Sequence, residues 1–313
     1  MSEAAYLVTG GCGFIGSHLA EELVAQGHRV RILDNLSSGY LRNVEHLGHR
    51  VEVIQGDVRD PAVVLRAAEG MRGIFHEAAL VSVFDSVNRP DDNHAINATG
   101  TLNVLQAARQ AKVKRVVLAS TAAAYGNDPE LPKHEGMRPQ PESPYAVAKV
   151  TGEHYQRIFA SLYGVETVTL RYFNVFGPRQ DPKSPYSGVI SKFCDDLAAQ
   201  RQSCVFGDGQ QTRDFVFVKD IVQGNLLAMS DAVEGKGQIY NIASGRTASL
   251  LDLLATLGRL TGRSLVPQHK EPRAGDIRHS AASIAAAQRE LGYVPKYELG
   301  TGLSALLKSL NLA

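Results

Sequence analysis

Short apolar runs rich in valine and isoleucine alternate with amphipathic segments of helical length over the first half of the chain. Strands that are apolar throughout and separated by helices indicate a parallel sheet that is covered on both faces. The pattern therefore predicts an α/β fold with a doubly wound parallel sheet. The predicted strands are 6–9, 29–34, 51–57, 73–79, 115–120 and 166–173, and the predicted helices are 15–26, 62–69, 95–112 and 143–163.

This alternation becomes irregular after about residue 174, where glycine and proline are frequent. A leucine-rich helical stretch around 250–257 and a helix over 283–291 follow. We therefore predict a first domain over 1–174 and a smaller α/β domain made mainly of 175–313. Segments such as 215–243 are candidates for a return to the first domain.

The composition of the 313 residues argues against several classes of function. A net charge of +1 gives no reason to expect nucleic acid or an anionic membrane as a partner. The cysteines Cys12, Cys194 and Cys204 are too scattered for a disulfide framework or a metal cluster. No apolar run approaches the roughly 20 residues that span a bilayer, and no basic leader begins the chain. These features predict a cytoplasmic protein without a metal ion.

Gly10, Gly13 and Gly16 follow the first predicted strand and precede a helix. A tight turn, a close approach of the backbone to a pyrophosphate and close helix–strand packing each exclude a Cβ. The helix N-terminus then offers free amides and the positive end of its dipole to the phosphates. The next strand ends in Asp34, 18 residues beyond Gly16, where a carboxylate binds both ribose hydroxyls and repels a 2′-phosphate. This context predicts bound NAD rather than NADP.

Asp57 ends the third predicted strand in Gly56-Asp57-Val58, where the adenine of such a cofactor lies. A cap at the end of a strand explains this aspartate equally well, so both interpretations stay open.

Tyr145 and Lys149 lie four residues apart near the start of a predicted helix, so they share one face. A free tyrosine has a pKa of about 10 and is a poor base at neutral pH. We expect the ammonium, together with oxidised nicotinamide, to lower that pKa. Thr121 follows the strand 115–120 and faces the same crevice, because the carboxyl ends of parallel strands face the ligand. Each feature alone has an ordinary structural explanation, but together they predict a site of proton transfer.

Eight segments carry a family resemblance. They are 9–18 (TGGCGFIGSH), 34–39 (DNLSSG), 76–79 (HEAA), Asn97, 145–149 (YAVAK), 171–179 (RYFNVFGPR), 207–215 (GDGQQTRDF) and 273–278 (RAGDIR). They resemble the extended short-chain dehydrogenase/reductase family, and more closely its nucleotide-sugar 4-epimerases, over almost the whole chain. The resemblance implies a Rossmann domain joined to a nucleotide-sugar domain, tightly held NAD and a homodimer.

The resemblance also implies roles for individual residues. Thr121, Tyr145 and Lys149 are implied to be catalytic. The residues implied to bind NAD are Gly10, Gly13, Phe14, Ile15, Gly16, Asp34, Asn35, Ser38, Gly39, Asp57, Val58, Ala78, Ala79, Asn97, Tyr145, Lys149 and Tyr172. Those implied to bind a UDP-sugar are Thr121, Tyr145, Asn174, Val189, Phe206, Arg213, Arg273, Asp276 and Ser280. The two arginines suit a diphosphate, because each guanidinium offers a planar fork of donors.

The implied reaction inverts the sugar at C4. Tyr145 removes the proton of the 4-hydroxyl as hydride passes to NAD, and the hydride returns after the 4-keto sugar has turned over. Related dehydratases place Asp-Glu directly after the threonine, and related decarboxylases carry a glutamate at the second of these positions, whereas this chain has Ala122 and Ala123. A methyl group cannot transfer a proton, so the pair favours epimerisation.

Besides another nucleotide-sugar-modifying enzyme, such as those that Ala122 and Ala123 disfavour, two alternatives stay open. A UDP-uronic acid 4-epimerase would share every catalytic residue, and the sequence assigns no donor to a uronate carboxylate. An NAD-binding regulator without activity is a second alternative, because fold alone does not imply function. The retained Thr121, Tyr145 and Lys149 argue against the regulator.

Ser280 bears on the choice of sugar. In the family, the position seven residues after the arginine that matches Arg273 flanks the sugar. Members restricted to glucose and galactose have tyrosine there, and members that accept N-acetylated sugars have a small residue. Ser280 therefore predicts activity on UDP-N-acetylhexosamines as well as on UDP-hexoses, unless it is a surface serine whose neighbours fill the space.

Overall fold

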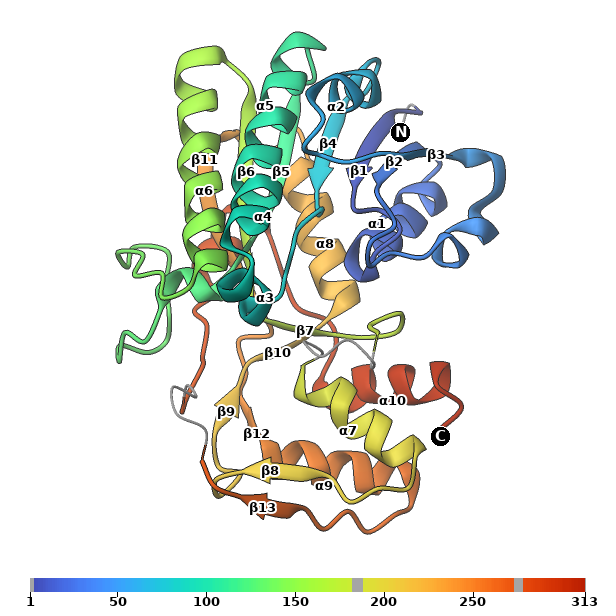
Figure 1. Ribbon diagram of the computed structural model, residues 1–313, viewed down its shortest axis with the longest axis vertical. Helices are drawn as coiled ribbons and strands as arrows, with labels where there is room; N and C mark the ends of the chain where they lie inside the picture. Colours follow the sequence, from blue (N-terminus) through green and yellow to red (C-terminus); the bar gives the residue numbers. More distant parts are fainter. Residues whose placement is uncertain (1–2, 182–187, 273–277, 313) are drawn as a thin grey trace.

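The computed structural model describes residues 3–181, 188–272 and 278–312. A seven-stranded parallel sheet in the order β11-β6-β5-β4-β1-β2-β3 forms the upper part of the molecule (Figure 1). This order confirms the predicted doubly wound α/β fold, since the chain moves outward from β1 first in one direction and then in the other. The strands are β1 (Ala5–Thr9), β2 (Arg29–Asp34), β3 (Val51–Gln55), β4 (Gly73–His76), β5 (Arg115–Thr121), β6 (Glu166–Tyr172) and β11 (Lys236–Ile242).

Helices cover both faces of this sheet, which explains why its strands are apolar throughout. In β1, Leu7 packs toward the face covered by α2 and α5, whereas Tyr6 and Val8 pack toward α1 and α8. Successive side chains of a strand point to opposite faces, so both sets are buried. The helices of this layer are α1 (Phe14–Ala25), α2 (Pro61–Ala68), α5 (Gly100–Gln110), α6 (Pro144–Tyr163) and α8 (Val218–Met229).

Two of these helices begin at a capping side chain that is followed by proline. Asp60 accepts hydrogen bonds from the amides of α2, and Ser143 does the same for α6. The helix predicted over 95–112 is divided into a π-helical turn, Ala95–Thr99, and α5. The short helices α3 (Val83–Asn88) and α4 (Pro90–His94) precede it and were not predicted.

A smaller group of elements lies below the sheet in Figure 1. Its helices pack around one apolar cluster that includes Phe176, Phe193, Leu254 and Leu303. Within this cluster, α9 carries the leucine-rich stretch predicted from the sequence. The elements are α7 (Val189–Ala198), α9 (Leu250–Thr261) and α10 (Leu299–Ser309), with the strand pairs β7 (Asn174–Phe176) and β10 (Phe215–Phe217), β8 (Cys204–Phe206) and β13 (Gln268–Lys270), and β9 (Thr212–Arg213) and β12 (Ala248–Ser249). The helix predicted over 283–291 contains a π-helical turn, Ala287–Leu291.

The chain returns to the large sheet within 215–243. Helix α8 covers the sheet beside α1, and β11 pairs in parallel with β6 from Lys236 to Ile242. The division of the chain into domains at residue 174 stays a prediction. Within the described ranges, no helix is long and apolar enough to cross a membrane.

Candidate active site

The turn between β1 and α1 has no room for a side chain at Gly10 or Gly16. A Cβ at Gly10 would lie 2.7 Å from the backbone nitrogen of Ala78, and one at Gly16 would lie 2.3 Å from the carbonyl oxygen of Gly10. Gly10 also has a φ of +69°, in the left-handed region that favours glycine. Gly13 is the N-cap of α1 and has no side chain to cap the leading amides. The turn therefore fits a pyrophosphate against the helix N-terminus.

The carboxylate of Asp34 is buried at the end of β2. One of its oxygens accepts a hydrogen bond from the backbone N–H of Cys12 at 2.9 Å, and the other accepts one from Leu36 at 2.8 Å. These bonds fix the acid beside the glycine turn, where the adenosine ribose of a dinucleotide lies. Gly39 closes over the same turn, because a Cβ there would lie 2.8 Å from the carbonyl carbon of Cys12.

Asn97 lies in the π-helical turn before α5, and its side chain is buried. Its amide oxygen accepts a hydrogen bond from the backbone N–H of Leu80 at 3.0 Å, and its amide nitrogen donates to the carbonyl of Leu80 at 3.0 Å. These bonds hold the loop that follows β4 and carries Ala78 and Ala79. Turns of this kind are frequent at functional sites. Asn97 thus stabilises the loop through its backbone. A contact of Asn97 with NAD stays a prediction.

Asp57 has partners for both of its carboxylate oxygens. Arg59 donates to it through its backbone N–H and through its guanidinium at 2.9 and 2.8 Å, and Asn35 donates at 2.9 Å. The hydrogen bonds from Arg59 hold the pKa of this carboxyl well below its usual range. The structure thus shows Asp57 as a cap at the end of the strand, which is one of the two interpretations given above. A contact of Asp57 with adenine stays a prediction.

The remaining predicted cofactor residues differ in their exposure to solvent. Phe14 and Ile15 are half-buried in the first turn of α1, Val58 is buried, and Ser38 is exposed.

Thr121 and Tyr145 form a hydrogen-bonded pair at the carboxyl end of β5. Thr121 is the last residue of that strand, and its hydroxyl also accepts a hydrogen bond from the N–H of Ala123 at 3.1 Å. Tyr145 lies in the first turn of α6. Lys149, one turn further along, donates from its ammonium to the carbonyl of Ala119 at 2.9 Å. The fold therefore brings the three predicted catalytic residues together.

Burial sets the pKa of Tyr145 in the protein without its ligands. The pKa is raised to about 12, mainly by burial and in smaller part by the charge of Glu77, while the hydrogen bond from Thr121 acts in the opposite direction. Burial also lowers the pKa of Lys149 to about 8. In the protein without its ligands, loss of solvent is thus the largest effect on the tyrosine pKa. The expected lowering by Lys149 together with oxidised nicotinamide stays a prediction.

A cavity of about 620 Å³ lies beside Thr121, whereas Tyr145 is not among the residues that line it. It is lined by residues that follow β5 and β6, together with residues of the smaller group of elements. The predicted residues that line it are Thr121, Tyr172, Asn174, Arg213 and Ser280, and the methyl groups of Ala122 and Ala123 lie in the same wall.

Some predicted substrate residues lie away from this cavity. Val189 begins α7 and Phe206 ends β8, and neither lines the cavity. Arg273 and Asp276 lie outside the described residues, so the expected arginine pair stays a prediction.

Several polar residues at the site were not predicted. Lys133 and Arg278 line the cavity, and Arg278 forms a two-bond ion pair with Asp208 at 2.7 and 2.8 Å. Glu77 accepts a hydrogen bond from the hydroxyl of Tyr172 at 2.7 Å. Glu77 and Arg278 both lie within motifs that carry the family resemblance, so the sequence could have pointed to them as site residues. Nothing in the sequence points to Lys133.

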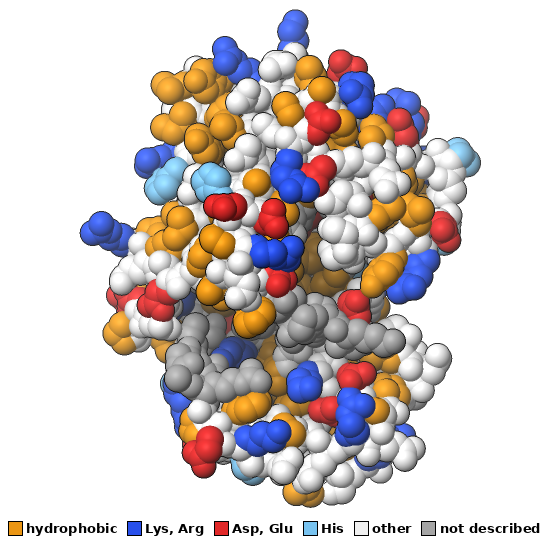
Figure 2. All heavy atoms as spheres, in the orientation of Figure 1, with side chains coloured by type: hydrophobic (Ala, Val, Ile, Leu, Met, Phe, Trp, Pro, Cys, Tyr) orange, Lys and Arg blue, Asp and Glu red, His pale blue; other side chains and the backbone are white. Residues whose placement is uncertain are grey.

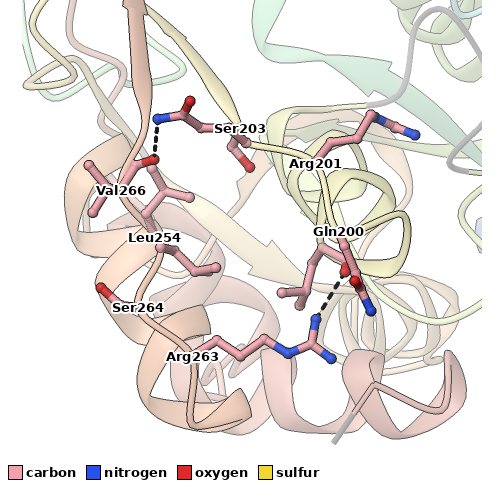
Figure 3. Close-up of a pocket in the computed structure, with 10 residues that line it drawn as sticks. Gln200, Arg201, Ser203, Leu254, Arg263, Ser264 and Val266 are labelled. Carbon is pink, nitrogen blue, oxygen red and sulfur yellow. Dashed lines mark hydrogen bonds between the residues drawn. The ribbon is translucent and has the colours of Figure 1, made fainter.

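A second hollow, of about 580 Å³, lies between the end of α7, α9 and residues 263–266 (Figure 3). Arg263 reaches across it to the carbonyl of Leu197 at 3.1 Å, and Gln202 donates to the carbonyl of Val266 at 3.0 Å. None of the described residues predicted for the site lines it, so we assign the chemistry to the cavity beside Thr121.

Comparisons with known proteins agree with this geometry. The model of the NAD dependent epimerase/dehydratase family matches residues 6–243. A UDP-glucose 4-epimerase of Mycolicibacterium smegmatis is 38% identical over 302 residues, which are 95% of this chain and 96% of that protein. The structure of a UDP-glucose 4-epimerase of Thermotoga maritima with UDP-glucose is 36% identical, with a TM-score of 0.92 and 98% of each chain covered. The structure of a UDP-N-acetylglucosamine 4-epimerase of Methanobrevibacter ruminantium M1 in complex with UDP-N-acetylmuramic acid is 34% identical, with a TM-score of 0.94 and 99% of each chain covered.

Proposed function

The chain belongs to the NAD-dependent epimerase/dehydratase family, and from that premise we propose that it is a UDP-sugar 4-epimerase. The observation that carries the proposal is the hydrogen bond between Tyr145 and Thr121, a residue that lines the cavity together with Ala122 and Ala123. The pair supplies the proton transfer that oxidation at C4 requires, whereas the two methyl groups supply none for elimination. The similarity to UDP-glucose and UDP-N-acetylglucosamine 4-epimerases supports the sugar nucleotide as substrate.

The chain's own residues hold and move one proton. Tyr145 accepts the proton of the sugar 4-hydroxyl and later returns it, and Thr121 holds the phenol through its hydroxyl. Lys149 places a positive charge on the same helix face, which favours the phenolate. When bound, NAD accepts hydride from C4 and returns it to the other face, and its nicotinamide charge also favours the phenolate.

The residues around the glycine turn fit NAD. The leading amides of α1 would hold the pyrophosphate, the Asp34 carboxylate would hold the adenosine ribose, and Lys149 would hold the nicotinamide ribose. The Asp34 charge favours NAD over NADP, because it repels a 2′-phosphate.

Inversion at C4 needs space in which the keto sugar can turn. The cavity of about 620 Å³ is lined by Arg213, which suits the diphosphate, and by the half-buried Ser280. A serine leaves space beside the sugar that a tyrosine ring would occupy. We therefore include UDP-N-acetylglucosamine and UDP-N-acetylgalactosamine among the substrates, alongside UDP-glucose and UDP-galactose.

The experiment is a panel of UDP-sugars, including UDP-glucuronic acid, assayed for 4-epimer formation with the unmodified protein and with Ser280→Tyr. We expect the unmodified protein to interconvert both the hexoses and the N-acetylhexosamines. Ser280→Tyr should abolish turnover of the N-acetylhexosamines by steric exclusion and leave UDP-galactose turnover largely intact, whereas Ser280→Ala should retain both. No turnover of any UDP-sugar would refute the function, and equal loss on both kinds of sugar would refute the role of Ser280.

A homodimer is the second part of the proposal. Helix α6 exposes Val147, Ile158 and Leu162, and α3 beside it exposes Phe84 and Val87, at 41–68% of their surface. Figure 2 shows apolar side chains gathered over α6 at the upper left of the molecule. Exposed apolar surface of this kind marks a site of association. We therefore assign this α3–α6 face to contact with a second copy of the chain.

A further inference from the structure

The chain that follows β7 lies against α1 (Figure 1). The guanidinium of Arg179 donates to the carboxylate of Glu21 at 2.7 Å and to the hydroxyl of Ser17 at 3.3 Å. Nε2 of His18 lies 2.9 Å from the carbonyl oxygen of Pro178, and it carries the proton because a carbonyl oxygen only accepts. Three side chains of α1 therefore hold this part of the chain.

The backbone at Arg179 has an uncommon conformation. Its φ is +68°, in the left-handed region that residues other than glycine rarely adopt. Such a conformation persists only where the surrounding contacts determine it, and it is frequent at functional sites. The side chain of Arg179 is 21% exposed, so its ion pair with Glu21 is partly shielded from solvent and salt. These contacts fix the path of the segment 178–181.

The segment 178–181 also contacts the loop that follows β2. The hydroxyl of Tyr40 donates to the carboxylate of Asp181 at 3.1 Å. The backbone N–H of Tyr40 donates to the carbonyl of Cys12 in the glycine turn at 3.0 Å. The segment therefore contacts α1 and the loop from Asp34 to Tyr40, which are the two elements that carry the proposed site for the adenosine half of NAD.

The first turn of α1 lies between this proposed site and the smaller group of elements. Its leading amides are the proposed donors to the pyrophosphate. Its side chains Phe14 and Ile15 pack against the apolar cluster of α7, α9 and α10. Strand β7, from which the segment starts, begins with Asn174 in the wall of the cavity. The segment thus joins α1 to the chain that forms a wall of the sugar cavity.

We propose that Arg179 is a positioning residue for NAD, one that keeps the crevice closed beside the bound cofactor. Its bonds to Ser17 and Glu21 oppose the separation of α1 from the segment 178–181, and such a separation opens the crevice beside the pyrophosphate. The inference rests on the proposed function in one respect, the placement of NAD at α1. It does not depend on which sugar the protein turns over.

The test measures how fast the NAD-loaded protein releases its cofactor. Excess alcohol dehydrogenase and ethanol reduce NAD once it is released, and the absorbance of NADH reports the release. Arg179→Gln and Glu21→Gln should each release NAD about three- to tenfold faster than the unmodified protein, because each breaks a hydrogen-bonded ion pair that is partly shielded. The two changes together should have no more effect than the larger single change, because both remove the same ion pair.

Arg246→Gln is the matched control. It breaks an ion pair of the same length, 2.7 Å, which Arg246 forms with Glu298 at the start of α10. Its release rate should equal that of the unmodified protein. Arg179→Lys should lie between Arg179→Gln and the unmodified protein, because an ammonium keeps the charge beside Glu21 but lacks the fork that also reaches Ser17.

Thermal unfolding separates this role from a purely structural one. Arg179→Gln should reduce the gain in Tm that NAD gives, because a ligand that binds more weakly stabilises less. An unchanged release rate in Arg179→Gln would overturn the proposal, whether or not its Tm falls. Release is measured without a UDP-sugar, so that result would leave the proposed function in place. A protein that turned over no UDP-sugar would refute the function and leave the expected release rates unchanged.

Discussion

At the scale of single residues, the surroundings of Tyr145 act on the pKa of its hydroxyl in opposite directions. Burial and the charge of Glu77 favour the neutral phenol, while the hydrogen bond from Thr121 favours the phenolate. The positive charge of oxidised nicotinamide would favour the phenolate further. The residues around the Tyr145 hydroxyl therefore couple its loss of a proton to the charge of the oxidised cofactor.

Replacing Tyr145 by phenylalanine should keep the fold and NAD binding, because the ring is retained. Turnover should fall by about 10² to 10⁴, the usual effect of losing a general base. Steady-state assays of 4-epimer formation measure this loss. Tyr163→Phe, at the exposed end of the same helix, is the control and should turn over normally. Near-normal turnover by Tyr145→Phe would contradict the catalytic assignment.

At the scale of elements, the β1–α1 turn depends on close backbone contact. Gly16→Ala places a Cβ 2.3 Å from the carbonyl oxygen of Gly10, so α1 must move away from β1. We expect NAD affinity to fall at least tenfold, because the helix amides leave their place beside the pyrophosphate. Titration of the apo-protein with NAD measures the change.

The control for this substitution is Gly300→Ala in α10. The nearest atom to its new Cβ lies 4.0 Å away, so NAD affinity should be unchanged and stability equal or slightly higher. Equal NAD affinity in Gly16→Ala and the unmodified protein would contradict the role of the turn.

The sequence predicts the interior strands better than the later elements for a physical reason. Strands such as β5 are buried on both faces and appear as apolar runs. By contrast, β11 lies at the edge of the sheet, begins with Lys236 and Gly237, and has a register shift between Lys236 and Gln238. Helix α10 was missed because Gly300 and Gly302 lie in its first turns, where propensity disfavours a helix.

The candidate site shows the same division. Gly10, Asp34 and Tyr145 could be predicted because their chemistry depends on local spacing along the chain. Glu77 was not assigned, because its hydrogen bond with Tyr172 joins the end of β4 to β6, which only the fold brings together. Lys133 likewise reaches the cavity through a loop whose path the sequence does not indicate.

At the scale of the whole molecule, the exposed α3–α6 face gives a test of the proposed dimer. Leu162→Glu places a charge on a side chain that is 68% exposed, so the folded monomer should tolerate it. A dimer through this face should dissociate, because an unpaired charge would be buried in the interface. Light scattering coupled to gel filtration measures the mass, with the exposed Val294→Glu as control. A mass that is unchanged in Leu162→Glu would contradict the assignment of this face.

The pairing of β11 with β6 also has a consequence for synthesis on the ribosome. Residues 173–235 separate the two strands, so β6 is made well before its partner. At ordinary translation rates that interval is on the order of ten seconds or less. During it β6 presents an open edge of backbone donors and acceptors, which is a template for pairing with another nascent chain. The order of translation therefore exposes this sheet to aggregation until residue 242 has emerged.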